Sequence, residues 1–291
     1  MDGPFIGSEA VNAGRIRKYT LYSSFRCLHP DVYIDPDAGL DAATQARAAW
    51  LWSRRRAVIA GQSAAALHGA KWVDDRQPAE LLYSQRRPPA GIRTWSDSIG
   101  DGEVRTIAGM LVTTPARTAL DLACRYPVGK AVAAIDALAR VTNLEQVDVE
   151  LLAERYKGRR GIRRARRVLS LIDAGAESPR ETWLRLLLIR AGFPPPQTQI
   201  PVRDDYGQLV AVLDMGWKHL KLAVEYEGDQ HRTDRRQFNK DIHRFEDVTE
   251  CGWVVVRVTV EDTEGGVIAR VSTAWDRRTC TQFEFSALAS N

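Results

Sequence analysis

Hydrophobic and polar residues alternate in two neighbouring runs of the C-terminal half, Ala211–Met215 and Lys221–Glu227. A period of two is typical of β-strands, and the few residues between the runs predict that the strands pair as a hairpin. Side chains two positions apart leave a strand on one face, so Glu225 and Glu227 are expected to point the same way. Asp214 closes the neighbouring strand. The pattern therefore predicts three carboxylates gathered at one end of a hairpin.

The periodicity around this hairpin changes between that of helices and that of strands. It predicts helices over 179–191 and 237–250, strands over 197–202, 209–215, 221–227 and 254–259, and a last helix near 266–278. The order is αβββαβ within residues 176–291. We therefore assign the chain to the α/β (α+β) class, with residues 176–291 as one domain.

The upstream sequence has shorter elements. Within residues 1–78, a helix near Ser8–Gly14 and a strand at Val32–Ile34 predict a small winged-helix-like region. Short strands separated by Pro-Pro, Asp-Gly and Gly predict a small antiparallel sheet between residues 79 and 113. The Thr114-Pro115 pair then predicts the start of a helix. This sheet, its helices and a basic linker helix make up the region 79–175.

The basic helix carries arginines at positions i, i+3, i+4 and i+7, which places them on one face. They are Arg160, Arg163, Arg164 and Arg167. Such a face favours contacts with nucleic-acid phosphates, and it is equally typical of a solvated helix that links two domains.

A second motif is the sequence Gly61-Gln62-Ser63-Ala64-Ala65, which imitates the nucleophile elbow of hydrolases but has Ala in place of the last Gly. We favour Ser63 as the cap of the helix that it precedes, because no series of strands and helices surrounds it to build a hydrolase sheet.

Composition narrows the function classes only modestly. The net charge of +4 and pI near 8.9 are compatible with nucleic-acid binding without indicating it. No run of about 18 apolar residues occurs, so no membrane span is predicted, and the first residues lack the pattern of a secretory signal. Four scattered cysteines form neither a zinc motif nor a disulfide framework, which favours a reducing, cytoplasmic location.

The carboxylates of the hairpin predict a metal site, because clustered acids repel one another unless a cation lies among them. Oxygen-only ligands suit Mg²⁺ or Mn²⁺. We predict Asp214 and Glu225 as ligands, with the Tyr226 carbonyl as a third. Glu227 would be a further ligand or would orient an attacking water, and His231 would act as general base or acid.

Two further residues have competing interpretations. Glu181 lies three residues after Ser178, which is the spacing of a capping box, and it is also placed to join the metal site. Arg244 is placed either to clamp a phosphate or to pair with Asp241 one helical turn away.

The αβββαβ order with these acids resembles the PD-(D/E)XK nuclease core. More closely, EYEGDQH followed by KDIHR resembles the endonuclease-like domain related to very-short-patch-repair (Vsr) endonucleases. The resemblance covers residues 178–262 and implies a metal-dependent DNA endonuclease. Glu227 stands where the PD-(D/E)XK lysine is found.

The upstream sequences GSEAVNAG, DVYI, AGQSAAALHGA and LVTTPARTALDLA resemble AbiEi-type antitoxin modules. That resemblance implies a DNA-binding or regulatory role. The sequence thus leads to two hypotheses, each with DNA as the partner and no membrane. The first is a Mg²⁺- or Mn²⁺-dependent endonuclease; the alternative is a non-catalytic, antitoxin-like regulator with a degenerate nuclease core.

Overall fold

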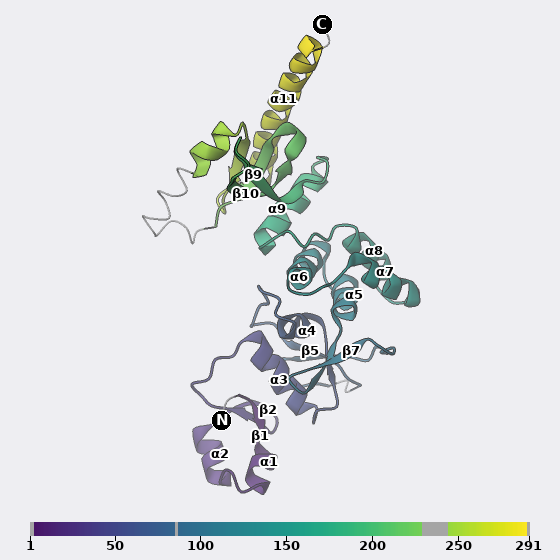
Figure 1. The fold of residues 1–291 in the computed structure, drawn as a ribbon. Helices are drawn as coiled ribbons and strands as arrows, with labels where there is room; N and C mark the ends of the chain where they lie inside the picture. The colour runs from purple at the N-terminus through teal and green to yellow at the C-terminus, as the bar shows by residue number, and fades with distance from the viewer. Residues whose placement is uncertain (1–2, 85–86, 229–243, 290–291) are drawn as a thin grey trace. The chain divides into compact units, whose positions relative to one another are not determined.

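The computed structural model of the protein describes residues 3–84, 87–228 and 244–289, with side chains described as far as residue 280 (Figure 1). The chain divides into two compact units, residues 1–174 and 175–291. Both mix helices with sheets, which confirms the predicted α+β class.

The first unit begins with two short helices followed by a hairpin. Strand β1 (Phe5–Ile6) precedes helices α1 (Gly7–Asn12) and α2 (Lys18–Ser24), and strands β2 (Arg26–His29) and β3 (Val32–Ile34) follow. The strands form an antiparallel sheet in the order β1-β3-β2. This is the winged-helix-like arrangement that the sequence predicts, with α2 as an additional helix.

Close packing around Gly7 holds the two short helices on this sheet. A Cβ atom at Gly7 would lie 2.6 Å from the Tyr33 ring and 2.8 Å from the Leu21 side chain. Leu21 is the buried residue of α2 and anchors that helix, and Tyr22 packs edge-on against Tyr33.

The winged-helix region is joined by ion pairs to the segment after α3 (Ala42–Trp52). Arg54 donates to the Asp31 carboxylate at 2.7 Å, and Arg55 makes two 2.6 Å bonds with Glu9. Arg54 and Arg55 both have left-handed backbone conformations, with φ of 56° and 64°. These two arginines therefore serve the fold of the first unit.

A five-stranded sheet forms the centre of the first unit. Its order is β6 (Ile92–Trp95), β5 (Ala79–Leu82), β4 (Val58–Ile59), β8 (Met110–Thr113) and β7 (Val104–Ile107). The prediction of an antiparallel sheet was wrong, because β4/β8 and β5/β6 are parallel pairs and the sheet is mixed. The physical reason is β4, a two-residue strand from upstream that lies between β5 and β8.

Helix α4 (Gly61–Leu67) follows β4 and packs on this sheet. Ser63 is buried inside α4, where its hydroxyl accepts the Glu80 amide at 2.9 Å. The N-cap is Ala60 and makes no side-chain cap bond, so the prediction that Ser63 caps the helix was also wrong. Ser63 instead ties α4 to β5.

Four helices complete the first unit: α5 (Pro115–Arg125), α6 (Val128–Val141), α7 (Gln146–Arg155) and α8 (Ile162–Leu169). As predicted, α5 starts at the Thr114 cap with Pro115 in its first turn. Ile162, Ala165 and Val168 of α8 are buried, and α8 contacts α5, α6 and α7. The basic helix therefore belongs to this helical layer and is not a linker between domains.

The second unit has the predicted order of elements. Helix α9 (Pro179–Arg190) is followed by β9 (Gln197–Arg203), β10 (Leu209–Trp217), the 3-10 turn η1 (Lys218–Leu220), β11 (Leu222–Tyr226), helical residues 244–250, β12 (Val254–Val258) and α11 (Glu264–Ala289). The sheet order is β12-β11-β10-β9, with β11/β12 parallel and the other pairs antiparallel. The predicted hairpin of the two alternating runs is β10/β11.

Apolar side chains of this sheet form two cores. Leu222 and Val224 of β11 join α9 and α11 in one core. Ala223, between them in sequence, joins Val248 and Trp253 in the other. Successive β11 side chains thus lie on opposite faces, as the alternation of the sequence predicts.

Candidate functional site

Two of the predicted carboxylates lie side by side in the second unit. Met215 pairs with Val224, and Asp214 and Glu225 are the next residues beyond that pair. Glu225 therefore lies on the Ala223 face of the sheet, the side on which residues 244–250 pack. Asp214 lies near it, since its charge acts on Glu225. The structure thus brings Asp214 of β10 and Glu225 of β11 together, as the sequence predicts.

Burial and neighbouring charges raise the pKa values of these acids. Burial is the main cause that raises the pKa of Asp214, and the nearby charge of Glu177 adds to it. The pKa of Glu225 is raised by burial and by the Asp214 charge, against the opposing charge of Arg244. Burial followed by the Asp214 charge also raises the pKa of Glu181. Glu181 and Glu225 thus both interact electrostatically with Asp214.

Each of these acids also has a protein partner. Asp214 accepts the Tyr226 amide at 3.0 Å. Glu225 accepts a 2.8 Å bond from Arg244, which also donates to the Val212 carbonyl at 2.8 Å. Arg244, predicted to clamp a phosphate or pair with Asp241, is therefore bonded to the predicted metal ligand. Asp241 and His231 lie outside the described residues.

Glu227 follows the last residue of β11, and its carboxylate pairs with a cation of β12. Strand β11 ends at Tyr226, and the Glu227 amide donates to the Val258 carbonyl at 2.7 Å. Its carboxylate is half-exposed and lies 3.1 Å from the Arg257 guanidinium. Arg257 stands opposite Glu225 on β12 and also lowers the pKa of that acid. A cation from β12 therefore lies near both Glu225 and Glu227, although no lysine follows the acids.

Glu181 makes the hydrogen bonds of the helix cap that was one of its two predicted roles. The Ser178 hydroxyl accepts the Glu181 amide at 3.2 Å, and the Glu181 carboxylate accepts the Glu177 amide at 2.8 Å and the Ser178 hydroxyl at 2.9 Å. The second predicted role of Glu181, in the metal site, stays a prediction. Its interaction with Asp214 is electrostatic.

The oxygen donors of the Asp214–Glu225 pair suit Mg²⁺ or Mn²⁺ in kind. Among the residues that the structure describes, however, no group of three or more His, Cys, Asp and Glu side chains has an arrangement able to hold a metal ion. The predicted third ligand, Tyr226, gives its amide to Asp214 and packs its ring against Trp183, with centroids 6.5 Å apart. These contacts use the amide and the ring of Tyr226, so the metal roles of Asp214, Glu225 and the Tyr226 carbonyl stay predictions.

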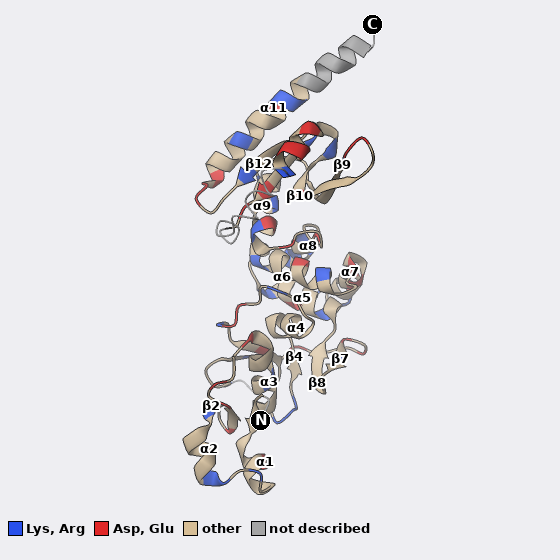
Figure 2. Cartoon of the chain, turned by 60° about the vertical axis from the view of Figure 1, so that its left-hand side comes forward, with Lys and Arg blue, Asp and Glu red and all other residues tan. Residues whose placement is uncertain are grey.

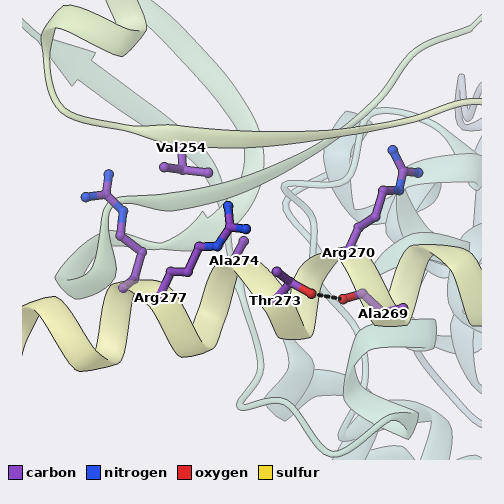
Figure 3. Close-up of a pocket in the computed structure, with 7 residues that line it drawn as sticks. Val254, Ala269, Arg270, Thr273, Ala274 and Arg277 are labelled. Atoms are coloured by element: carbon purple, nitrogen blue, oxygen red, sulfur yellow. Dashed lines mark hydrogen bonds between the residues drawn. The ribbon is translucent and has the colours of Figure 1, made fainter.

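The second unit also contains a cavity of about 340 Å³ between β12 and α11 (Figure 3). Its arginines are engaged within the unit: Arg270 pairs with Asp262 at 2.6 Å, and Arg278 donates to the Gly252 carbonyl. Val254 of β12 and Ala274 of α11 add apolar surface. This cavity therefore offers few groups to bind a charged ligand.

Helix α8 begins at Ile162, so Arg163, Arg164 and Arg167 lie on it, whereas Arg160, predicted on the same helical face, lies before its Gly161 cap. All four are exposed, and Arg164 donates to the Cys124 carbonyl. Within the described residues, Arg160, Arg163 and Arg167 form no ion pair or hydrogen bond. Arg160 and Arg164 line a cavity of the first unit, whereas Arg163 and Arg167 are not among its lining residues.

The exposed side of α2 is a site that the sequence analysis missed. Arg17 and Lys18 are exposed at its start and, in the part of the chain that the structure describes, pair with no acid; Figure 2 marks basic residues in blue at this position. Tyr19 is 83% exposed and Tyr22 63%. Basic and aromatic side chains on one short helix are typical of surfaces that contact nucleic acid. The signal was RIRKYTLY, where charge and aromatics alternate without a helical apolar period.

Comparison with known proteins places part of the first unit in a family. Residues 56–173 match the family model of the AbiEi antitoxin C-terminal domain. The chain is also similar to the uncharacterized proteins MT2308 and Rv2248 of Mycobacterium tuberculosis strains CDC 1551 and H37Rv. Each is 31% identical over 194 residues, which cover 66% of this chain and 70% of the relative. No solved structure gives a significant match.

The family match confirms the AbiEi-like part of the resemblance and lies wholly within the first unit. In the described parts of the chain, no helix combines the length and the apolar character needed to cross a membrane.

Proposed function

Because the chain belongs to the family of the mycobacterial proteins MT2308 and Rv2248 and carries an AbiEi antitoxin C-terminal domain, we propose that it is a DNA-binding regulator of the antitoxin type. The proposal rests above all on one observation, the solvent-exposed basic and aromatic side of α2 in the winged-helix region. Of the two hypotheses from the sequence, it is the regulator that the family match supports better.

The position of α2 supports a role as recognition helix. In helix-turn-helix proteins and their winged variants, the second helix enters the major groove while the first stays outside. Helix α2 follows α1 after a short turn and buries only Leu21 fully, so Arg17, Lys18 and Tyr19 are exposed for contact, while Tyr22 is exposed and also packs edge-on against Tyr33 with ring centroids 6.2 Å apart. The β2/β3 hairpin follows directly and corresponds to the wing.

The side chains of α2 suggest how the contact is divided. Arg17 and Lys18 would neutralise phosphates, which supplies affinity without sequence preference. Tyr19 and Tyr22 carry both a ring and a hydroxyl and would contact sugar or base edges. The 2.6 Å pairs between Arg55 and Glu9 fix α1, and hence the helix pair, to the rest of the first unit. DNA would thus meet a surface already in its binding conformation.

Fluorescence anisotropy on duplexes selected from a random-sequence pool tests this proposal. The double variant Arg17→Glu/Lys18→Glu should lose affinity for all duplexes at least about tenfold, and the slope of log affinity against log salt should fall by about two units. Arg163→Glu/Arg167→Glu is the matched control, with the same charge change on two exposed, unpaired arginines of the same unit. It should bind like the unmodified protein.

Three results would contradict the proposal. Absence of salt-dependent binding to any duplex would remove DNA as the partner. A loss of affinity in the control alone would move the interface to α8, as one of the sequence-based interpretations has it, and an equal loss in both variants would mean that affinity follows overall charge and not α2.

The second candidate function is the metal-dependent DNA endonuclease, and the buried Asp214–Glu225 pair on neighbouring strands favours it. Mg²⁺ or Mn²⁺, once bound, would activate water and neutralise charge on a phosphodiester. Asp214 and Glu225 would hold the ion, with Glu181 beside Asp214 and Glu227 at the end of β11. His231 keeps its predicted role in proton transfer. Plasmid cleavage in the presence of Mn²⁺ should then occur, and Asp214→Asn should abolish it. If the protein cuts no plasmid, only the regulator hypothesis remains.

A further inference from the structure

The first unit contains a cavity of about 550 Å³ where the end of β6, the end of α5 and the segment before α8 meet. A volume of this size is within the usual range for small-molecule sites. Its lining is dominated by guanidinium groups with two aromatic rings. The lining residues are Arg93, Trp95, Asp97, Cys124, Arg125, Tyr126, Arg159, Arg160 and Arg164.

Positive charge in this cavity exceeds what its own acid can neutralise. Five of the lining residues are arginines, and the only acid among them is Asp97. Asp97 is shared, since Arg125 pairs with it and Arg159 lies 3.0 Å from it. Arg159 also bonds Asp121 at 2.5 Å behind the cavity. Arg93 pairs with the buried Glu80 at 3.0 Å. Arg160 has no acidic partner among the described residues, so the five arginines still outnumber Asp97, Asp121 and Glu80, and the cavity keeps a net positive charge.

Two buried guanidinium nitrogens of the cavity lack hydrogen-bond partners within the described structure. They are Nε of Arg125 and Nη1 of Arg159. Unpaired buried donors are costly, and a bound acceptor would satisfy them. Burial is the main cause that lowers the pKa of Arg125 to about 10, and the charge of the neighbouring Arg159 adds to it.

The surrounding structure keeps these cations in place. The Arg125 guanidinium lies 3.8 Å from the centre of the Trp95 ring. Gly161 has a φ of +89°, and a Cβ atom there would lie 2.2 Å from the Cys124 carbonyl oxygen. Only glycine allows so close an approach with this backbone conformation, and it brings Arg159 and Arg160 to the end of α5. The site is therefore built by the fold before any ligand arrives.

We infer that this cavity binds a compact polyanion, the phosphate chain of a nucleoside di- or triphosphate. Guanidinium forks match phosphate oxygens in geometry, and several of them around one cavity match a ligand with several charges on neighbouring phosphates. A nucleic-acid backbone spreads its charges along a line, whereas these arginines converge on one hollow. The inference goes beyond the proposed function, since no lining residue belongs to the winged-helix region.

Isothermal titration calorimetry on the full chain with GTP, ATP and inorganic tripolyphosphate tests this inference. One equivalent should bind per chain, and Arg160→Glu should weaken binding by about ten- to hundredfold, as expected for one lost charge-assisted contact. Arg163→Glu is the matched control, because Arg163 is equally exposed and unpaired within the described structure but lies outside the cavity lining. Its affinity should equal that of the unmodified protein.

The outcomes distinguish anion binding in the cavity from non-specific attraction to surface charge and from nucleic-acid binding. Equal affinity for tripolyphosphate and the nucleotides would support the inference. Weaker binding of tripolyphosphate would also support it and would show that the cavity recognises the nucleoside as well. No binding of any of the three anions at millimolar concentration overturns it, and so does an equal loss in Arg163→Glu. Duplex DNA that binds through Arg160 while tripolyphosphate does not would assign these arginines to a nucleic-acid surface instead.

Discussion

Arg117 shows at the scale of one residue how the first unit holds charge in its interior. Its side chain is fully buried, pairs with Glu103, and bonds Asp121 through Nε at 3.1 Å. The Tyr156 hydroxyl bonds the same Glu103 carboxylate at 2.8 Å. A buried ion pair is weak evidence of net stabilisation, but its partners become costly when one charge is removed.

Arg117→Met should therefore lower the free energy of unfolding by about 3–5 kcal/mol, because Glu103 and Asp121 would stay buried with less compensation. Urea unfolding followed by circular dichroism measures this change. Arg167→Met, on the exposed face of α8, should change the same quantity by less than about 0.5 kcal/mol. Equal effects of the two substitutions would mean that the buried network does not depend on Arg117.

The acids of the second unit predict a pH dependence of stability with a definite sign. Burial raises the folded-state pKa of Asp214, so the stabilisation from its protonated form is complete below the unfolded pKa and is lost as the pH rises through the folded value. Asp214→Asn keeps an acceptor for the Tyr226 amide and removes the charge. The metal-free variant should therefore melt several degrees higher at pH 7 and show no gain in strong acid.

Asp262 provides the opposite control for this experiment. The Thr259 amide and Arg270 lower the pKa of Asp262, so its ionised form stabilises the fold above the unfolded pKa. Asp262→Asn should thus melt lower at pH 7 and lose that difference as the pH falls. If both asparagine variants shifted the melting temperature in the same direction, the assignment of raised and lowered pKa values would be wrong.

At the scale of elements, the periodicity of hydrophobic residues predicted the helices and strands that bury one face. The β10/β11 hairpin and α9 were predicted from alternation and from the Ser178 cap, and both form. Helix α2 was missed because only Leu21 is buried in it, which leaves no helical period to read. Strand β11 ends at Tyr226, one residue before Glu227, so alternation fixes the direction of Glu225 and the predicted direction of Glu227 stays a prediction.

The mixed sheet escaped prediction for a related reason. Strand β4 has two residues, too few to show a period, and its partners are separated from it in sequence, β5 by helix α4 and β8 by α4 and three strands. Pairing order depends on such long-range contacts, which a local pattern does not encode. The arginine cavity likewise depends on β6, α5 and the segment before α8, which are far apart in the sequence.

The packing of α2 gives a prediction at the same scale. A methyl group at Gly7 would collide with Tyr33 and Leu21, the contacts that seat α2 on the hairpin. Gly7→Ala should therefore displace α2 and weaken DNA binding by about tenfold or more while the rest of the first unit stays folded. Gly14→Ala is no suitable comparison because Gly14 has a φ of +68°.

The control for Gly7 is Gly129→Ala in α6, where the added methyl would meet nothing within 4 Å. DNA affinity should remain unchanged in that variant. Normal affinity in Gly7→Ala would show that α2 tolerates the shift or does not contact DNA.

At the scale of the whole molecule, each unit has its own hydrophobic cores and its own sheet. Residues 1–174 expressed alone should therefore fold cooperatively and bind DNA with the affinity of the full chain, because α2 and its supports all lie within that unit. Thermal unfolding and anisotropy of the two proteins provide the comparison. A tenfold loss of affinity in the shortened protein would mean that residues 175–291 contribute to the interface.

The rate at which the Cys124 thiol is labelled measures local opening of the first unit. Its thiol is buried, and burial raises the pKa of that thiol, so the reactive thiolate is doubly suppressed while α8 stays docked against the Cys124 carbonyl. Cys27 and Cys280 are exposed and react without any such delay. The slow phase of thiol labelling then counts the excursions in which α5 and α8 separate. A polyanion that bridges these two helices would lower the labelling rate of Cys124. The same cysteine therefore reports occupancy of the cavity without a label on the ligand.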